Sequence, residues 1–492
     1  CMAFIEAKRH EKGLDLCLLV LLMCLSIWMR WPLLSASPHL DEIWHFGISA
    51  KHSLVDVVVG SRSVAHPPLY FVVLRLWLPF GSSIEWLRSL SLLASTVSIF
   101  FIYLICSSIR LPRTLGLTLC LFWITSPTLS HVAAEVRGYA VSQLFLWINL
   151  YAFILVITQG SSRSRDLSFI LSGTLALFSI HASIFQVAMT SLFFFLHIVR
   201  GQTTPAKGFL KRLASCLPYL GILLVPVFFL ILQYQGKFTA HIKQFMYAGS
   251  YHNFLAIRDF ITSQLFNYLR KLSAVHITTV SEVLLIFFSL TGWYCNFIRK
   301  TLPTPLFFVL IGPALLHILA SLLGYYPFGG YERYNTSSYP ALLSFILIGV
   351  FLLFHALSLP PKQKSVIAIA FLCSCLLLVP STLKVRLKTE YWDRSPFIEM
   401  IRRYPAERLV LSMRAEHCLK FVDYSTSSFT LADQEFNAPD PRTKLASCLE
   451  RYGECYYVQD AFSDKNAALL RNLHSRFAAF ALTYLEEYNF RH

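Results

Sequence analysis

Long apolar runs separated by short polar loops fill most of the chain. A membrane-spanning α-helix needs about 20 apolar residues, and this pattern predicts a polytopic α-helical membrane protein with about 11 transmembrane helices. The first apolar run has no small-residue cleavage site, so we interpret it as a retained span. The predicted spans are residues 14–35, 86–108, 114–131, 138–158, 167–181, 183–199, 213–234, 282–298, 303–324, 339–358 and 365–383.

The stretch from Leu167 to Val199 is too long for one span and too short for two full ones, with His181 and Ser183 in its middle. Loop charge decides between these alternatives. If the stretch is a helical hairpin, every even-numbered loop carries lysine or arginine, as cytoplasmic loops do. If it were a single span, the basic loops after residue 200 would fall on the other side. We therefore predict a hairpin, with the N-terminus inside and the C-terminus outside.

This orientation places residues 36–85, 131–138, 235–281 and those after 384 on the outer face. In the first of these loops, "DEIWHFGISAKHSLVDVVV" and "PPLYFVVLRLWLPF" carry apolar residues at helical spacing but are too short or too charged to span. They predict interfacial helices lying in the membrane plane. The proline pair fits the start of the second helix, where a missing N–H costs nothing.

The chain after residue 383 has many charges, short β-like runs ("ERLVLSM", "ECYYVQD") and amphipathic helical stretches ("SPFIEMIRRY", "NAALLRNLHSRFAAFALTYLEEY"). We predict two domains: a membrane domain over 1–383 and a small soluble α/β domain over 384–492 on the outer face. Cys448 and Cys455 fit either a disulfide or two free buried thiols, and Cys418 has no evident partner.

Composition supports the membrane class. Of 492 residues, 55% are hydrophobic and 14% charged, against roughly 25% charged in a soluble domain. The formal charge of +16 does not indicate nucleic-acid binding, because the basic residues lie mostly in short loops between apolar runs. Most of the 12 cysteines lie in or beside apolar runs, where cysteine behaves as a small hydrophobe.

The first candidate site is "SPHLDEIWHF", where Asp41, Glu42 and His45 share one face if a helix starts after Pro38. A structural interpretation makes Asp41 a helix cap and Glu42 a partner of the helix dipole. A functional interpretation makes this group a general base or a metal site, because an imidazole beside a carboxylate can orient it or share a cation.

Other outer segments add ionisable groups. His66 precedes the proline pair, which would hold its imidazole in a defined place; a surface histidine is the alternative. In "HVAAEVRGYA", Glu135 and Arg137 lie so close to the bilayer that each needs a partner or a function. They are two positions apart and would not face each other on a helix, so we expect each to find its partner elsewhere.

The loop "YYPFGGYERYNTSSYP" leads into a late span and contains Arg333 and Tyr334. An arginine here can grip an anionic headgroup with two hydrogen bonds, and interfacial anchoring by tyrosine and arginine is the alternative. Asn335 begins an Asn-Thr-Ser glycosylation sequon, which is a weak match. Together, the outer loops indicate a site for a phosphate-bearing lipid and a polar acceptor.

The order of these segments resembles the GT-C superfamily of membrane glycosyltransferases, in the branch of the protein O-mannosyltransferases and the lipid A aminoarabinose transferase. The matching segments are "LDEIWHF", "HPPLYFVVLRLWLPFGSSIEWLRSLSLLAS", "SPTLSHVAAEVRGYAVSQLFLWINLY" and "YERYNTSSYPALL". The second is the most specific, with its proline pair, interfacial helix, glycine-containing turn and arginine. The resemblance covers the first 200 or so residues well, the later spans loosely and the C-terminal domain hardly at all.

The resemblance implies transfer of a sugar, of the mannosyl or another hexosyl type, from a polyprenyl-phosphate donor on the outer face. Asp41 matches the catalytic aspartate of the first loop, and Glu42 follows it as in several members. Asp41, or else Glu42, would take a proton from the acceptor hydroxyl in a single inverting displacement. His66 occupies the position of a lysine near the donor phosphate, but Ala65 replaces the acidic metal ligand before it. A divalent metal ion is therefore possible but has no assigned ligands.

By the same resemblance, Arg137, His66 and Arg333 would stabilise negative charge on the departing lipid phosphate, while Glu135 would orient Arg137 or contact the sugar. We place His45, His181 and Tyr334 with these substrate-binding candidates. The expected partners are the lipid-linked donor, an acceptor protein, lipid or glycan, membrane lipids and, as a further option, other subunits of a membrane complex. The expected location is the bacterial inner membrane.

Two alternatives stand beside the enzyme. A transporter or flippase of a lipid-linked saccharide would bind phosphate with the same cations, but it would place polar residues or broken helices near the bilayer midplane. In this chain the charged residues within the predicted spans are few and lie near the ends. A non-catalytic GT-C-like subunit of a larger complex is the second alternative, and it would tolerate loss of Asp41.

Overall fold

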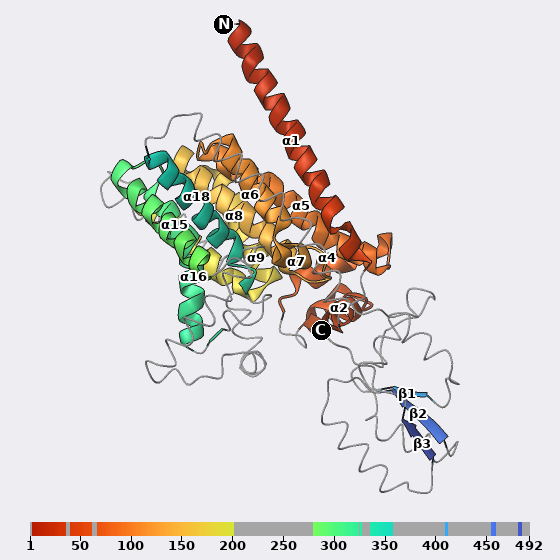
Figure 1. The fold of residues 1–492 in the computed structure, drawn as a ribbon. Coiled ribbons are helices and arrows are strands. Elements are labelled where there is room, and N and C mark those ends of the chain that lie inside the picture. Colours follow the sequence, from red (N-terminus) through yellow and green to blue (C-terminus); the bar gives the residue numbers. More distant parts are fainter. Residues whose placement is uncertain are drawn as a thin grey trace.

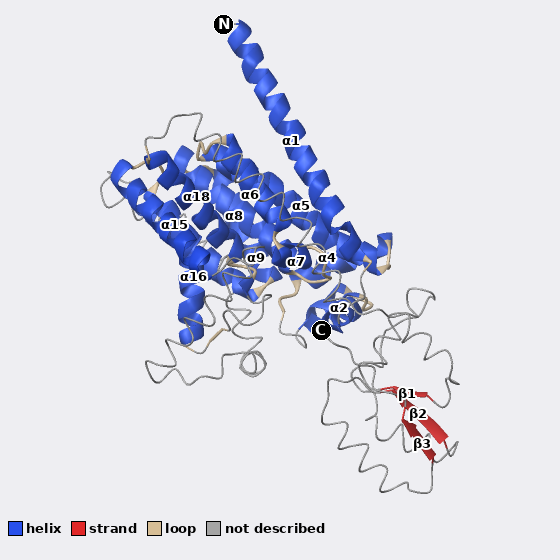
Figure 2. Cartoon of the chain, in the orientation of Figure 1, coloured by secondary structure: helices blue, strands red, loops and turns tan. Residues whose placement is uncertain are grey.

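The protein, described by a computed structural model, is mostly helical (Figures 1 and 2). Four described helices are long and apolar enough to cross a membrane: residues Asp15–Leu34 of α1 (Met2–Leu34), α5 (Ile84–Ser108), α8 (Tyr139–Gln159) and α16 (Thr304–Leu322). The residues that the structure describes are 2–35, 40–61, 66–200, 279–323, 325–326, 335–357, 409–411, 454–458 and 481–484.

The remaining predicted spans within the described residues also fall on helices. These are α6 (Arg113–Thr125), α9 (Arg163–Ser179), α10 (Ile184–Arg200), α15 (Thr279–Arg299) and α18 (Tyr339–Ala356). The predicted break in this stretch is confirmed, because α9 ends at Ser179 and the short 3₁₀-helix η3 (His181–Ser183) separates it from α10. That both helices cross the membrane stays a prediction. The predicted spans at 213–234 and 365–383 lie outside the described residues, as does the proposed domain boundary near 383.

The single span predicted over 114–131 is wrong. Helix α6 ends at Thr125, and a second helix, α7 (Pro127–Val132), follows it. Ser126 adopts φ −59° and ψ 122°, the extended conformation that a residue before proline favours. Its side chain accepts a hydrogen bond from the N–H of Leu129 at 3.5 Å and caps α7. The chain therefore turns at this point.

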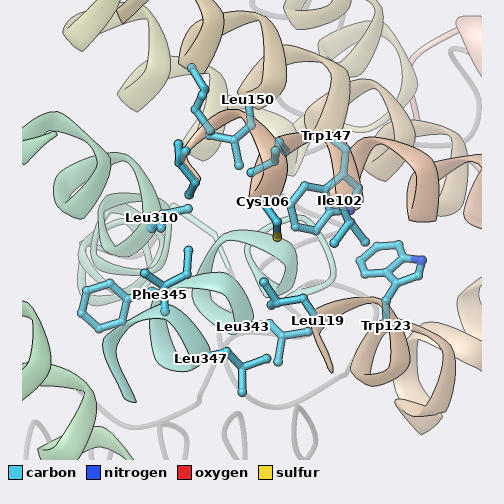
Figure 3. Packing of buried hydrophobic residues seen from close by; sticks show 14 of the residues in the cluster. Ile102, Cys106, Leu119, Trp123, Trp147, Leu150, Leu310, Leu343, Phe345 and Leu347 are labelled. Carbon is cyan, nitrogen blue, oxygen red and sulfur yellow. The ribbon is translucent and has the colours of Figure 1, made fainter. Parts of the chain in front are cut away.

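The helices pack around one large apolar core (Figure 3). Trp123 from α6 and Trp147 from α8 meet edge to face with ring centroids 5.6 Å apart, and Phe345 from α18 stacks on Trp293 from α15 at 5.5 Å. Helices α15 and α18 approach very closely: a Cβ atom at Gly292 would overlap the backbone carbonyl oxygen of Gly349. Small residues permit such an approach between membrane helices.

A buried arginine attaches α1 to this bundle. Arg30 is fully buried and donates hydrogen bonds to Ser26 and Ser95 at 2.8 and 2.9 Å. It also donates to the carbonyl oxygens of Trp123 at 2.7 Å and Ile124 at 3.5 Å. These carbonyls lie in the last turn of α6, where the helix dipole is negative, so they are suitable acceptors for a cation.

The first loop forms short helices, as predicted: α2 (Leu40–Ser49), α3 (Leu54–Gly60) and α4 (Leu69–Trp77). The first apolar stretch is two helices rather than one, because Ser53 and Asp56 form a capping box that starts α3 afresh. Pro68 is the N-cap residue of α4, which confirms the predicted start.

The turn between α4 and α5 is fixed by a tryptophan pair. Trp77 and Trp86 stack at 5.0 Å, and each indole N–H donates to the other residue's carbonyl oxygen, at 3.1 and 3.2 Å.

Three short strands form a parallel sheet in the order β1-β2-β3: β1 (Leu409–Leu411), β2 (Glu454–Val458) and β3 (Ala481–Tyr484). The two predicted β-like runs are confirmed as β1 and β2. The helix predicted over "NAALLRNLHSRFAAFALTYLEEY" is wrong at its "ALTY" segment, which is β3. Pairing with β2 overrides a weak local helix preference there. The other predicted elements of this region lie outside the described residues.

Candidate active site

The candidate site lies at the end of the bundle where α2 meets the turn between α7 and α8. Asp41 and Glu42 occupy the first turn of α2, and Arg137 lies two residues before α8 begins at Tyr139. Gly138 allows this turn to pack closely, because a Cβ atom there would come within 2.9 Å of the carbonyl oxygen of Ser179. The segment carrying Arg137 is thereby held against the end of α9.

Glu42 is buried in the site, and its carboxylate accepts three hydrogen bonds. Arg88 of α5 donates Nε–H to Oε1 at 2.9 Å and Nη2–H to Oε2 at 2.7 Å, and the N–H of Val136 also donates to Oε1 at 2.8 Å. The Glu42 side chain is 2% exposed. Burial would raise the pKa of Glu42, but the charge and hydrogen bonds of Arg88 outweigh burial and lower it.

Arg88 also connects Glu42 to the first span. Its Nη1 donates to the carbonyl oxygens of Leu33 and Leu34 at 3.2 and 2.9 Å. These carbonyls belong to the last turn of α1. The pair formed by Glu42 and Arg88 therefore joins the ends of α1, α2 and α5 to the turn before α8.

Asp41 and Arg137, the neighbours of Glu42 and Val136, form a second ion pair between Oδ2 and Nη2. Arg137 is 7% exposed, and its guanidinium lies 5.5 Å from the ring centroid of Tyr139. Its Nε is buried and has no hydrogen-bond partner within the described residues. Burial would lower the pKa of Arg137, but nearby charges, led by Asp41, raise it above its ordinary value.

Two histidines line the same region. The Nδ1–H of His45 donates to the carbonyl oxygen of Asp41 at 2.6 Å, and its ring stacks on Phe71 at 4.8 Å. The ring of His66 lies 5.1 Å from that of His45 and meets Tyr139 edge to face at 6.3 Å. Burial and the charge of Arg137 lower the pKa of His45 to about 4. Burial and the nearby His45 hold the pKa of His66 well below its ordinary value.

The expectation that Glu135 and Arg137 have separate partners is confirmed. Glu135 pairs with His131, with Oε1 and Nδ1 2.8 Å apart. The backbone carbonyl of Glu135 accepts hydrogen bonds from Ser91 at 2.6 Å and from the N–H of Arg137 at 2.9 Å. The turn is therefore anchored to α5 and folded on itself.

The structure brings most of the predicted site residues together. His181, in η3, is near enough for its charge to lower the pKa of His66 further. Arg333 and Tyr334 lie outside the described residues. Within the described ranges, His, Cys, Asp and Glu side chains form no group of three or more that could hold a metal ion.

Sequence reasoning gave no role to Arg88 or to His317. Arg88 had a signal, because an arginine within an apolar run needs a partner. His317 is buried near the C-terminal end of α16, stacks on Phe185 at 4.6 Å and meets Tyr326 edge to face at 5.2 Å. Asn335, the residue of the weak sequon, is fully buried.

No protein-family model matches the chain, and no curated protein matches it. Among solved structures, the chain is similar to the crystal structure of an oligosaccharyltransferase from Archaeoglobus fulgidus, tethered through a disulfide bond to an acceptor peptide containing an Asn-Val-Thr sequon. The two are 11% identical, and the similarity covers 89% of this chain and 68% of the other, with a TM-score of 0.43. A likeness of this size identifies neither a shared fold nor a shared activity.

Proposed function

We propose that this protein is a membrane glycosyltransferase that moves a sugar from a polyprenyl-phosphate donor to an acceptor hydroxyl. The observation that carries this proposal is the buried guanidinium of Arg137, which is paired with Asp41. The Nε atom of Arg137 has no hydrogen-bond partner within the described residues. A guanidinium suits two-point binding of phosphate oxygens. A carboxylate beside it can take a proton from a hydroxyl group, so one small site holds both functions that the transfer needs.

The transfer is a single displacement. Asp41 takes the proton of the acceptor hydroxyl while the hydroxyl oxygen forms a bond to the anomeric carbon. The bond from that carbon to the phosphate oxygen breaks, and its electron pair stays on the phosphate. The polyprenyl phosphate therefore gains one negative charge, which Arg137 stabilises. Asp41 returns its proton to water or to the departing phosphate, and the anomeric configuration is inverted.

We assign Glu42 a positioning role instead of the base role. Both of its oxygens already accept hydrogen bonds from Arg88, and Oε1 accepts a further one from Val136. Removing Glu42 from this arrangement would leave the Arg88 charge buried and unpaired, which is costly. Asp41 is 19% exposed, so it is the more accessible of the two carboxylates.

The imidazoles of His45 and His66 suit uncharged hydrogen-bonding partners of the donor. Both pKa values are lowered, so the rings are neutral at pH 7 and add no fixed charge beside Arg137. We assign Glu135, which pairs with His131, to contact with the sugar or to an influence on Arg137. His181, Arg333 and Tyr334 remain binding candidates from the sequence.

The membrane setting follows from the apolar helices. We place the site on the outer face by the distribution of basic loops, with the polyprenyl tail between helices. Mannose or another hexose as the sugar, a peptide, lipid or glycan as the acceptor, and the bacterial inner membrane as the location are parts of this proposal that rest on sequence resemblance.

The first test is transfer of radiolabelled sugar from a panel of short-chain polyprenyl-phosphate donors to a membrane extract, with purified wild-type protein and the Asp41→Asn variant. We expect product from the wild type and a loss of about 10²- to 10⁴-fold in the variant, the range typical of a general base. Glu85→Gln is the matched control, because Glu85 is an exposed carboxylate in the first turn of α5.

Each outcome separates the alternatives. Loss of transfer in Asp41→Asn with normal transfer in Glu85→Gln supports the proposed base. Equal transfer by the wild type and Asp41→Asn would remove the base role from Asp41. Donor binding without product from any donor would instead favour a flippase or a non-catalytic subunit of a larger complex.

A further inference from the structure

Asp41 and Arg137 occupy each other in the unliganded protein. Nη2 of Arg137 is bonded to Oδ2 of Asp41. The proposed function needs the guanidinium for the donor phosphate and the carboxylate for the acceptor proton. The lone pair of Oδ2 that accepts this guanidinium N–H is not available to a hydroxyl while the ion pair is closed. This contact therefore competes with both catalytic roles.

We propose that the ion pair between Asp41 and Arg137 is a resting-state latch that the donor phosphate opens, so that the donor must bind before the acceptor can react. This inference rests on the proposed function. The phosphodiester of the donor carries one negative charge and replaces Asp41 as the partner of Arg137. The released carboxylate oxygen then accepts the proton of the acceptor hydroxyl. Arg137 thus pairs with Asp41 in the unliganded protein and with the phosphate once the donor is bound.

The surroundings suit an exchange of partners at Arg137. Tyr139 lies against the guanidinium and can keep its plane in place while its hydrogen bonds change. Nε is buried without a partner within the described residues, so a phosphate gains a donor that Asp41 does not use. Two-point binding of phosphate by Nε and an Nη atom would satisfy it.

The neighbouring pair, Glu42 with Arg88, does not have the properties of a latch. Its side chains are 2% and 1% exposed and share two hydrogen bonds, with a third from the N–H of Val136. By contrast, the side chains of Asp41 and Arg137 are 19% and 7% exposed and are joined through Oδ2 and Nη2. The buried pair fixes the backbone beside both latch residues, so the latch can open without separating α2 from the turn before α8.

The latch is tested by binding of a short-chain polyprenyl phosphate to the full-length protein in detergent. We expect Asp41→Asn and Asp41→Ala to bind this lipid about tenfold more tightly than the wild type, a typical coupling between two linked contacts. The isosteric asparagine guards against misfolding, and the alanine removes any residual hydrogen bond to Arg137. Melting temperatures near that of the wild type verify that both variants are folded.

Two control variants separate the latch from the general effect of removing a negative charge. Glu135→Gln removes a carboxylate that acts on Arg137 through space and should tighten binding much less. Asp15→Asn breaks the ion pair between Asp15 and Arg113, 2.7 Å long, near the start of the first span, and should leave binding unchanged. Equal tightening by Glu135→Gln and Asp41→Asn would overturn the latch.

The remaining outcomes are also decisive. Unchanged or weaker lipid binding by both Asp41 variants would overturn the latch while leaving the proposed transfer intact. No binding of polyprenyl phosphate by any form of the protein would overturn the proposed function itself.

The order of binding has its own test. Protein preloaded with radiolabelled donor is mixed with membrane extract and a large excess of unlabelled donor. Donor-first binding predicts that the bound label is converted to product before it exchanges. Steady transfer with no trapped label would overturn the proposed order.

Discussion

Glu42 and Arg88 form a buried ion pair with two parallel hydrogen bonds, of 2.9 and 2.7 Å, between α2 and α5. Because Val136 donates to the same carboxylate, this pair determines where the two ionisable groups beside it can meet. Asp41 precedes Glu42 and Arg137 follows Val136, so the inner pair sets the position of the outer one.

Breaking the inner pair should destabilise the protein strongly. Removing one partner of a buried ion pair costs about 3–5 kcal/mol, because the other charge is left without compensation. We expect Arg88→Met and Glu42→Gln each to lower the melting temperature in detergent. The double variant should be less destabilised than the sum of the single variants. Additive effects in this double-mutant cycle would contradict a direct interaction.

Arginine and lysine should not be interchangeable at position 137. Lysine keeps the charge but lacks the planar fork that grips phosphate at two points. We expect Arg137→Lys to bind a short-chain polyprenyl phosphate about tenfold more weakly, the effect of losing roughly 1.4 kcal/mol. The comparison is Arg88→Lys, which should lower the melting temperature more. Wild-type affinity in Arg137→Lys would argue against a phosphate at this residue.

Stability should fall in acid because of His45. Its pKa is about 4 in the folded protein and about 6.5 when unfolded, so the unfolded chain binds more protons between these values. Stability is therefore lost as the pH falls from about 6.5 towards about 4, by on the order of 3 kcal/mol, and is unaffected above that window.

The measurement for His45 is unfolding at a series of pH values for the wild type and His45→Asn. Asparagine can still donate to the carbonyl oxygen of Asp41 but does not titrate. A variant with the same acid dependence as the wild type would exclude His45 as its source.

The close contact of α15 with α18 should not tolerate a methyl group. A Cβ atom at Gly292 would overlap the carbonyl oxygen of Gly349, so the helices must separate. We expect Gly292→Ala to lose about 1–3 kcal/mol of stability, as overpacked cores do. Leu290→Ala is the control, because Leu290 lies on the same helix and is 44% exposed. Similar melting temperatures for the two variants would contradict this contact.

Asn335 should carry no glycan. Its side chain is fully buried, and neighbouring Thr336 is 1% exposed, so a glycosylating enzyme cannot reach the sequon in the folded protein. Mass spectrometry of the peptide containing Asn335, from protein made in a glycosylating host, should find it unmodified. A glycan at this position would require a different packing of the segment before α18.

Local features were predictable from the sequence. The positions of the apolar helices, the break at His181 and the start of α4 after Pro68 depend on hydropathy, loop charge and proline. The break before Pro127 was visible as a Ser-Pro pair but was missed inside an apolar run. Strand β3 was mistaken for a helix because its pairing with β2, not its composition, decides its conformation.

The candidate site was predictable as a set of residues but not as a set of contacts. Asp41, His66 and Arg137 stood out as ionisable groups next to apolar runs. The partner of Glu42 lies 46 positions away, and that of Asp41 lies 96 positions away. No local pattern distinguishes the buried pair from the accessible one. The pairing depends on how α2, α5 and the turn before α8 pack together.

The hydrogen bonds of Arg30 also constrain the assembly of the protein in the membrane. Its carbonyl acceptors on Trp123 and Ile124 follow it by 93 and 94 positions, so the first span is synthesised long before they exist. An arginine in a lone helix is unfavourable in the bilayer interior and is tolerated near the water interface. The first helix therefore inserts before the α6 acceptors of Arg30 are present. Its final depth and rotation in the membrane are fixed only when α6 packs against it.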